Sequence, residues 1–145
     1  MKPEELQIGD WVKCRERDCG GHRVDYISEM DDEVGVDGEI LNLNRIFPLP
    51  LTPKILEKNG FENIPYAGID CNEIWLLHEI SYYGKSFPLY TDDIMLRYSI
   101  SEQCWYIFFN IGGTYSDFKT ITNIFYVHEL QHALRLCKID KEIIL

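Results

Sequence analysis

The pattern with the clearest chemical potential is His128-Glu129-Leu130-Gln131-His132. An HExxH pattern on a helix places two imidazoles one turn apart on the same face, where both can bind one zinc ion. The glutamate between them can then act as a general base on a metal-bound water. The spacing by itself therefore suggests a zinc-dependent hydrolase in which His128 and His132 hold the metal and Glu129 is the base.

The helix around this pattern predicts a less reactive arrangement. On a helical wheel of about 100° per residue, the apolar residues form one arc, and the bisector of His128 and His132 lies roughly opposite its centre. The residues of this arc are Tyr126, Val127, Leu130, Ala133, Leu134 and Cys137. Arg135 projects near the histidines, where its charge would repel a dication, and no histidine follows His132. We therefore predict that both histidines face solvent. The chain is then expected to have no catalytic residue and to bind no metal ion or cofactor. The zinc-dependent hydrolase is the alternative.

Three further patterns are weaker. Cys14, Cys19 and His22 supply only three of the four ligands that a structural zinc requires, and their places in strands and a turn favour a structural role. His78 lies among apolar residues and is expected to be a hydrogen-bonded sheet histidine. Gly84-Lys85-Ser86 resembles the end of a phosphate-binding loop but lacks the first glycine of that motif.

The composition limits the classes of partner. The 145 residues suffice for about one domain, and their formal net charge is −10. So acidic a chain is a poor candidate for nucleic acid or an anionic membrane, since both attract proteins mainly through Lys and Arg. The longest apolar run, Cys104 to Phe109, is far shorter than the roughly 20 residues that cross a bilayer, and the first residues contain no signal-peptide run. We therefore expect a cytoplasmic protein with a protein partner, with neither nucleic acid nor membrane as a ligand. The composition leaves the oligomeric state open.

Five cysteines occur at irregular spacing. In a cytoplasmic chain, an odd number without a regular framework is typical of reduced thiols.

The first fifty residues are typical of short strands separated by turns. Asp37-Gly38 stands between Val34-Gly35-Val36 and Glu39 to Leu43, which is a strong signal for a two-residue hairpin. Four or five short strands at this spacing predict a small, strongly bent β-barrel of the SH3-like kind over residues 1–50.

Residues 51–145 are predicted to form an α+β subdomain, either separate from the first or one compact unit with it. Thr52 is a good N-cap, Pro53 suits the first helical turn and Gly60 is a typical stop, so a short helix is expected from Pro53 to Asn59. An antiparallel β-meander and a C-terminal amphipathic helix should follow, which makes the whole chain α+β. The expected elements are a strand over Ile94 to Ile100, a central strand over Cys104 to Phe109, a helix over Ile124 to Cys137 and a last strand over Glu142 to Leu145. The pattern over Asn72 to Tyr83 fits either a strand or a helix.

Three stretches together resemble a known family. They run from Lys2 to Val12 (KPEELQIGDWV), from Ile46 to Phe61 (IFPLPLTPKILEKNGF) and from Tyr126 to Leu136 (YVHELQHALRL). Their order and spacing are similar to a family of small uncharacterised proteins encoded by gut bacteria and their phages or prophages. The family has no established activity and typically carries Asn at the position of His132. The resemblance therefore implies a phage-related protein in which the second zinc ligand is not a family feature.

Taken together, these features predict a non-enzymatic cytoplasmic interaction module of phage or prophage origin. The zinc-dependent hydrolase is the alternative, and the metal content of the protein distinguishes it. A nucleic-acid-associated barrel, suggested by the expected fold alone, is a third hypothesis that salt-dependent DNA binding distinguishes.

Overall fold

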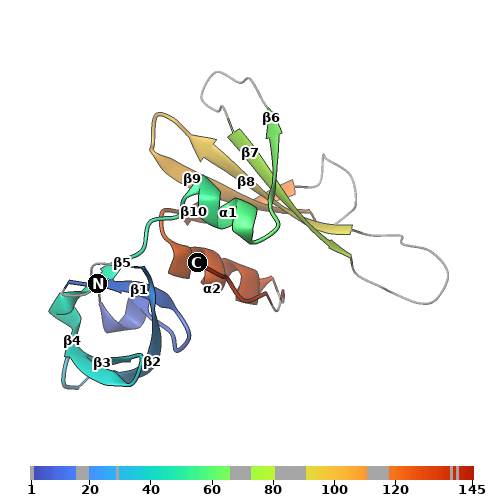
Figure 1. Cartoon of the computed structure of the whole chain (residues 1–145). Helices are drawn as coiled ribbons and strands as arrows, with labels where there is room; N and C mark the ends of the chain where they lie inside the picture. Colours follow the sequence, from blue (N-terminus) through green and yellow to red (C-terminus); the bar gives the residue numbers. More distant parts are fainter. Residues whose placement is uncertain are drawn as a thin grey trace.

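The computed structural model describes residues 2–15, 20–28, 30–65, 73–80, 91–110, 118–137, 139 and 141–145. Two antiparallel five-stranded sheets and two short α-helices make up this part of the chain, which confirms the α+β class (Figure 1). The elements in chain order are the 3-10 helix η1 (Pro3–Glu5), β1 (Trp11–Cys14), β2 (His22–Ser28), β3 (Glu33–Val36), β4 (Glu39–Asn42), the 3-10 helix η2 (Leu43–Arg45), β5 (Ile46–Pro48), α1 (Pro53–Lys58), β6 (Glu62–Pro65), β7 (Glu73–Ile80), β8 (Thr91–Ser99), β9 (Cys104–Asn110), β10 (Phe118–Ile124) and α2 (Val127–Leu136).

The N-terminal sheet has the strand order β4-β3-β2-β1-β5. The predicted hairpin is confirmed, since β3 pairs with β4 around Asp37 and Gly38, whose φ angles are 52° and 81°. Positive φ at both central residues is what a type I′ turn requires. Strands β4 and β5 are the edges of this sheet, so the described pairings do not close it into the barrel expected for residues 1–50. Its inner face holds an apolar cluster of Leu6, Val12, Cys14, Val24, Val34, Val36, Leu43 and Ile46.

The second sheet has the strand order β10-β9-β8-β7-β6. Strand β7 settles the open choice between strand and helix in favour of a strand for Glu73–Ile80. Strand β9 lies between β8 and β10, as expected for an apolar central strand. Trp75, Leu96 and Ile107 from this sheet are buried in one cluster with residues of both α-helices.

The short helix α1 begins at Pro53 as predicted and ends at Lys58, one residue earlier than predicted, with Asn59 as its C-cap. The Thr52 hydroxyl accepts a hydrogen bond from the Ile55 N–H at 3.4 Å, and Pro53 occupies the first turn. Gly60 has a φ of 76°, a conformation that disfavours any side chain at this helix stop. Phe61 then folds back into the core, and its N–H donates to the Leu56 carbonyl at 3.1 Å.

Helix α2 lies between the N-terminal sheet and the second sheet with α1 (Figure 1). Leu130 and Leu134 are fully buried in the apolar cluster of the second sheet. The same helix contacts β1 of the N-terminal sheet on another side. Within the described ranges, no helix has the length and apolar character needed to cross a bilayer.

The prediction of a strand reaching Ile100 is wrong by one residue. Strand β8 ends at Ser99, and Ile100 is exposed in the turn before β9. Gln103 in this turn has a φ of 53°, so the chain reverses direction there and the period-two alternation ends before Ile100.

The prediction of a last strand over Glu142 to Leu145 is also wrong. Residues 141–145 adopt no regular structure, but Ile143 is buried and its carbonyl accepts a hydrogen bond from Trp11 Nε1 at 2.7 Å. The side-chain amide of Asn59 makes two hydrogen bonds of 2.8 Å with the main chain of Ile144. Side chains therefore hold this segment in place of a strand ladder.

Candidate functional site

The HELQH helix is buried on two sides, so the prediction that both histidines face solvent is wrong. His128 is only 4% exposed, Gln131 is buried as well, and His132 is partly buried. The helical wheel identified the apolar contact with the second sheet correctly. It did not identify the polar contact with β1, because a buried polar edge satisfied by hydrogen bonds leaves no mark in a hydrophobicity pattern.

Asp10, immediately before β1, is the centre of this polar contact. Its side chain is completely buried. Oδ2 accepts hydrogen bonds from His132 Nε2 at 2.8 Å and from the Gln7 N–H at 2.7 Å, and Oδ1 accepts one from Arg135 Nη1 at 3.3 Å. A carboxylate without contact to water needs such donors, since an unpaired buried charge is costly. We call Gln7, Asp10, His132 and Arg135 the Asp10 cluster.

Gln131 joins the same two elements through uncharged groups. Its Nε2 donates to the Gly9 carbonyl at 3.2 Å, and its Oε1 accepts from the Trp11 N–H at 3.2 Å. The side-chain amide of Gln131 thus donates to one main-chain group and accepts from another, as a peptide group of a neighbouring strand would. This pair of bonds fixes the position of α2 along β1.

Glu129, the candidate general base, caps the start of α2. Its Oε2 accepts hydrogen bonds from the Phe125 N–H at 2.6 Å and the Tyr126 N–H at 3.0 Å. A glutamate at the third helical position commonly reaches back in this way, and its charge is favourable near the positive end of the helix. In this arrangement the carboxylate serves the helix terminus, whereas a general base must face the reacting water.

His128 has an unusual environment. Its ring stacks on Tyr126, with centroids 5.8 Å apart and an interplanar angle of 8°. The centroid of the His132 ring lies 5.7 Å from that of His128, with an interplanar angle of 76°. Its Nδ1 is buried and has no hydrogen-bond partner in the described part of the chain. Burial lowers the pKa of His128 below its ordinary value, because the charged imidazolium is disfavoured away from water. Among the residues that the structure describes, no three His, Cys, Asp or Glu side chains group to hold a metal ion.

The other predicted metal ligands are separated. Cys14 is buried in the N-terminal cluster, whereas His22 Nδ1 lies 2.7 Å from Asp37 Oδ2. Cys19, the side chain of His78 and residues 84–86 are outside the described residues.

The described cysteines, Cys14, Cys104 and Cys137, form no disulfide. Burial raises the pKa of the Cys137 thiol, which leaves less of the reactive thiolate at neutral pH. Cys19 and Cys71 lie outside the described residues, so the expectation of five reduced thiols remains a prediction for these two.

A cavity of about 200 Å³ opens beside the Asp10 cluster. It is lined by Arg23 of β2, Gln131 and Arg135 of α2, and Ile139, Lys141 and Glu142 of the segment after α2. We call it the arginine cavity. Sequence reasoning missed both this cavity and Asp10, since their residues come from distant parts of the chain. The one local signal is Gly9, whose φ of 90° reflects a turn that directs Asp10 towards α2.

No protein-family model, curated protein or solved structure matches this chain.

Proposed function

We propose that the protein is a non-enzymatic interaction module of the cytoplasm, of phage or prophage origin, which binds a protein partner through its N-terminal sheet. The HELQH helix supports a structural role for its polar residues. Glu129 caps the helix, Gln131 bridges to β1, and His132 pairs with Asp10. Because these contacts engage Glu129 and His132, the base and one of the two metal ligands of the hydrolase hypothesis, the geometry gives no support to zinc-dependent hydrolysis.

For residues 1–50 we propose an SH3-like module as the finer fold. Two observations support it. The strand order is β4-β3-β2-β1-β5, and the 3-10 helix η2 connects β4 to β5 along the chain. This arrangement is found in SH3-like barrels. Such a fold does not identify a ligand, so the surface of the module must do so.

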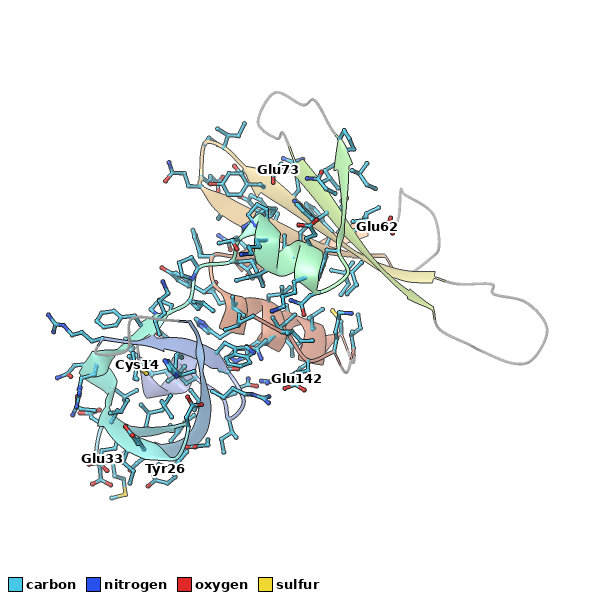
Figure 2. All side chains as sticks on the ribbon, in the orientation of Figure 1. Cys14, Tyr26, Glu33, Glu62, Glu73 and Glu142 are labelled. Atoms are coloured by element: carbon cyan, nitrogen blue, oxygen red, sulfur yellow. The ribbon has the colours of Figure 1, made fainter. Side chains whose placement is uncertain are left out.

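The outer face of β2, β3 and β4 is the observation that carries the proposal. Tyr26, Gly35 and Ile40 lie opposite one another across the three strands, and Tyr26 and Ile40 are 47% and 65% exposed. Gly35 between them is itself buried, because the side chains of Asp25 and Tyr26 cover the position that a Cβ atom would take. Residues 24–44 contain seven Asp and Glu but no Lys or Arg. We call the exposed surface of these strands and of the turns that join them the acidic face, and Figure 2 labels Tyr26 and Glu33 on it.

The chemistry of the acidic face indicates its partner. Exposed tyrosine is among the residue types that contribute most to protein interfaces. A field of a single sign accelerates association with an oppositely charged partner and excludes one of like charge. The acidic face therefore suits a protein segment that combines Lys or Arg with apolar side chains, and it disfavours nucleic acid.

Selection from a displayed random-peptide library tests this proposal. The wild-type protein should enrich peptides that combine basic and apolar residues. The double variant Tyr26→Ser/Ile40→Ser should bind a selected peptide at least about tenfold more weakly, a loss of about 1.4 kcal/mol. Ile100→Ser removes an apolar side chain exposed in the turn between β8 and β9 and is the matched control, so it should leave the affinity unchanged.

Two outcomes contradict the proposal. The first is a library from which no basic, apolar sequence emerges. The second is a selected peptide that loses equal affinity to the double variant and to Ile100→Ser, since binding would then not depend on the acidic face.

A further inference from the structure

Three basic side chains from two distant parts of a strongly acidic chain meet at the arginine cavity. Arg23, Arg135 and Lys141 line it together with one carboxylate, that of Glu142. The chain as a whole has a formal net charge of −10, so this local excess of positive charge is opposite in sign to the rest of the molecule. We infer that the arginine cavity binds a small phosphate group, either inorganic phosphate or the phosphate of a small phosphomonoester. This inference concerns a different surface from the acidic face and does not depend on the proposed function.

The two guanidinium groups are held in place and directed to one point. Arg135 is fixed through Nη1, which donates to Gln7 Oε1 at 2.7 Å and to Asp10 Oδ1 at 3.3 Å. Arg23 is fixed through its Nη1, which lies 2.5 Å from Glu142 Oε1, and its guanidinium lies 5.5 Å from the centre of the Trp11 ring. Both groups are therefore oriented before any ligand arrives.

Gly9 shows how close these groups come to each other. A Cβ atom on Gly9 would lie 3.4 Å from Arg135 Nη2 and 3.5 Å from Arg23 Nη2. The two Nη2 atoms therefore lie on either side of Gly9, no more than about 7 Å apart, and no hydrogen bond joins either of them to another described residue. Like charges at this separation repel each other, and an oxyanion that accepts from both removes that repulsion.

The size and charge of the cavity favour phosphate over other anions. A volume of about 200 Å³ accepts a phosphate group with a small substituent but not a drug-sized ligand. Arginine matches phosphate oxygens well because its planar fork presents several donors in a fixed geometry. The side chains that line the cavity are three cations and one carboxylate, and Asp10 offsets part of the charge of Arg135 from behind, so a net positive charge remains that complements an anion.

Glu142 already occupies part of the position that a ligand would take. Its carboxylate pairs with Arg23, and both side chains are largely exposed, 61% for Glu142 and 45% for Arg23. An ion pair this exposed contributes little to stability, so an incoming phosphate can displace it. Figure 2 labels Glu142 beside α2. Glu142 therefore acts as a built-in competitor for the ligand.

Calorimetric titration at low ionic strength tests the inference, with inorganic phosphate and glycerol 3-phosphate as the two probes. Lys141→Gln removes one lining charge and should weaken phosphate binding about tenfold. Glu142→Gln removes the competitor and should strengthen binding several-fold. Lys54→Gln removes the same type of charge from the exposed surface of α1 and should change the affinity less than about twofold. Tighter binding of glycerol 3-phosphate than of inorganic phosphate would identify the ligand as a phosphomonoester, and the reverse would identify free phosphate.

The opposite signs of the first two variants make the test decisive. The absence of saturable phosphate binding to the wild-type protein overturns the inference. If Lys141→Gln and Lys54→Gln weaken phosphate binding equally, the inference is also overturned, because the surface charge alone would then attract the phosphate. Weaker binding to Glu142→Gln contradicts the role of Glu142 as a competitor and thereby the assigned position of the ligand.

Discussion

The two sides of α2 are attached to the molecule by different forces. Towards the second sheet, Val127, Leu130 and Leu134 are fully buried among apolar side chains. Towards the N-terminal sheet, Gln131 and His132 make directional hydrogen bonds to residues at the start of β1. Apolar burial depends on area and volume, whereas a buried polar contact depends on matched donors and acceptors. The apolar side should therefore determine most of the stability, and the polar side should determine the position of the N-terminal sheet and the response to pH.

Removal of an apolar side chain should have the largest effect. Leu130→Ala leaves a cavity in the cluster of the second sheet and should lower the free energy of unfolding by about 3 kcal/mol, measured by urea denaturation. Leu136→Ala, on the 78% exposed Leu136, is the control and should change it by less than about 0.5 kcal/mol. Similar losses in the two variants would contradict an apolar anchor on this side of α2.

Removal of the buried charge on the polar side should have a smaller effect. Asp10→Asn weakens the bonds to His132 and Arg135 and should cost about 2 kcal/mol in the same measurement. Glu57→Gln makes the same chemical change on the exposed face of α1 and should be close to neutral. A double-mutant cycle with His132→Asn should show clear non-additivity, because both residues belong to one cluster. Strictly additive effects would mean that the pair is not coupled.

The smallest effect concerns pH. Burial lowers the pKa of His128 in the folded protein, so as the pH falls below about 6.5 the unfolded chain takes up this proton first. The stability that neutral His128 provides is therefore complete above that pH and is lost as the pH falls towards the folded pKa. His128→Phe keeps a ring against Tyr126 and cannot titrate, so its stability should fall less steeply between about pH 7 and pH 5.5. Since His132, Glu129 and Asp10 are present in both proteins, equal slopes would show that His128 is not the group responsible.

Sequence reasoning predicted the features whose determinants are local. The Asp37-Gly38 hairpin and the helix between Thr52 and Gly60 depend on φ angles and caps within a few residues. Each signal is complete in a short segment, so no knowledge of the remaining chain is needed.

The polar side of α2 lay beyond such reasoning for a physical reason. His132 and Asp10 are separated by 122 positions, and neither residue indicates the other. The helical wheel assumes one buried face, whereas α2 lies between two sheets and buries two. A histidine paired with a buried carboxylate has the same sequence signature as one in water, so HELQH was predicted to lie on an exposed face.

The long separation of Asp10 from His132 also has a consequence for the order of folding. The strands of the N-terminal sheet all lie within residues 11–48, so they can pair after closing short loops. The contact with α2 closes a loop of 122 residues, which costs more chain entropy and takes longer to find. We expect the N-terminal sheet to form first, with Asp10 still hydrated. The arrival of α2 then strips water from this carboxylate, so the slow phase of folding should report the dehydration of one charge rather than the pairing of strands.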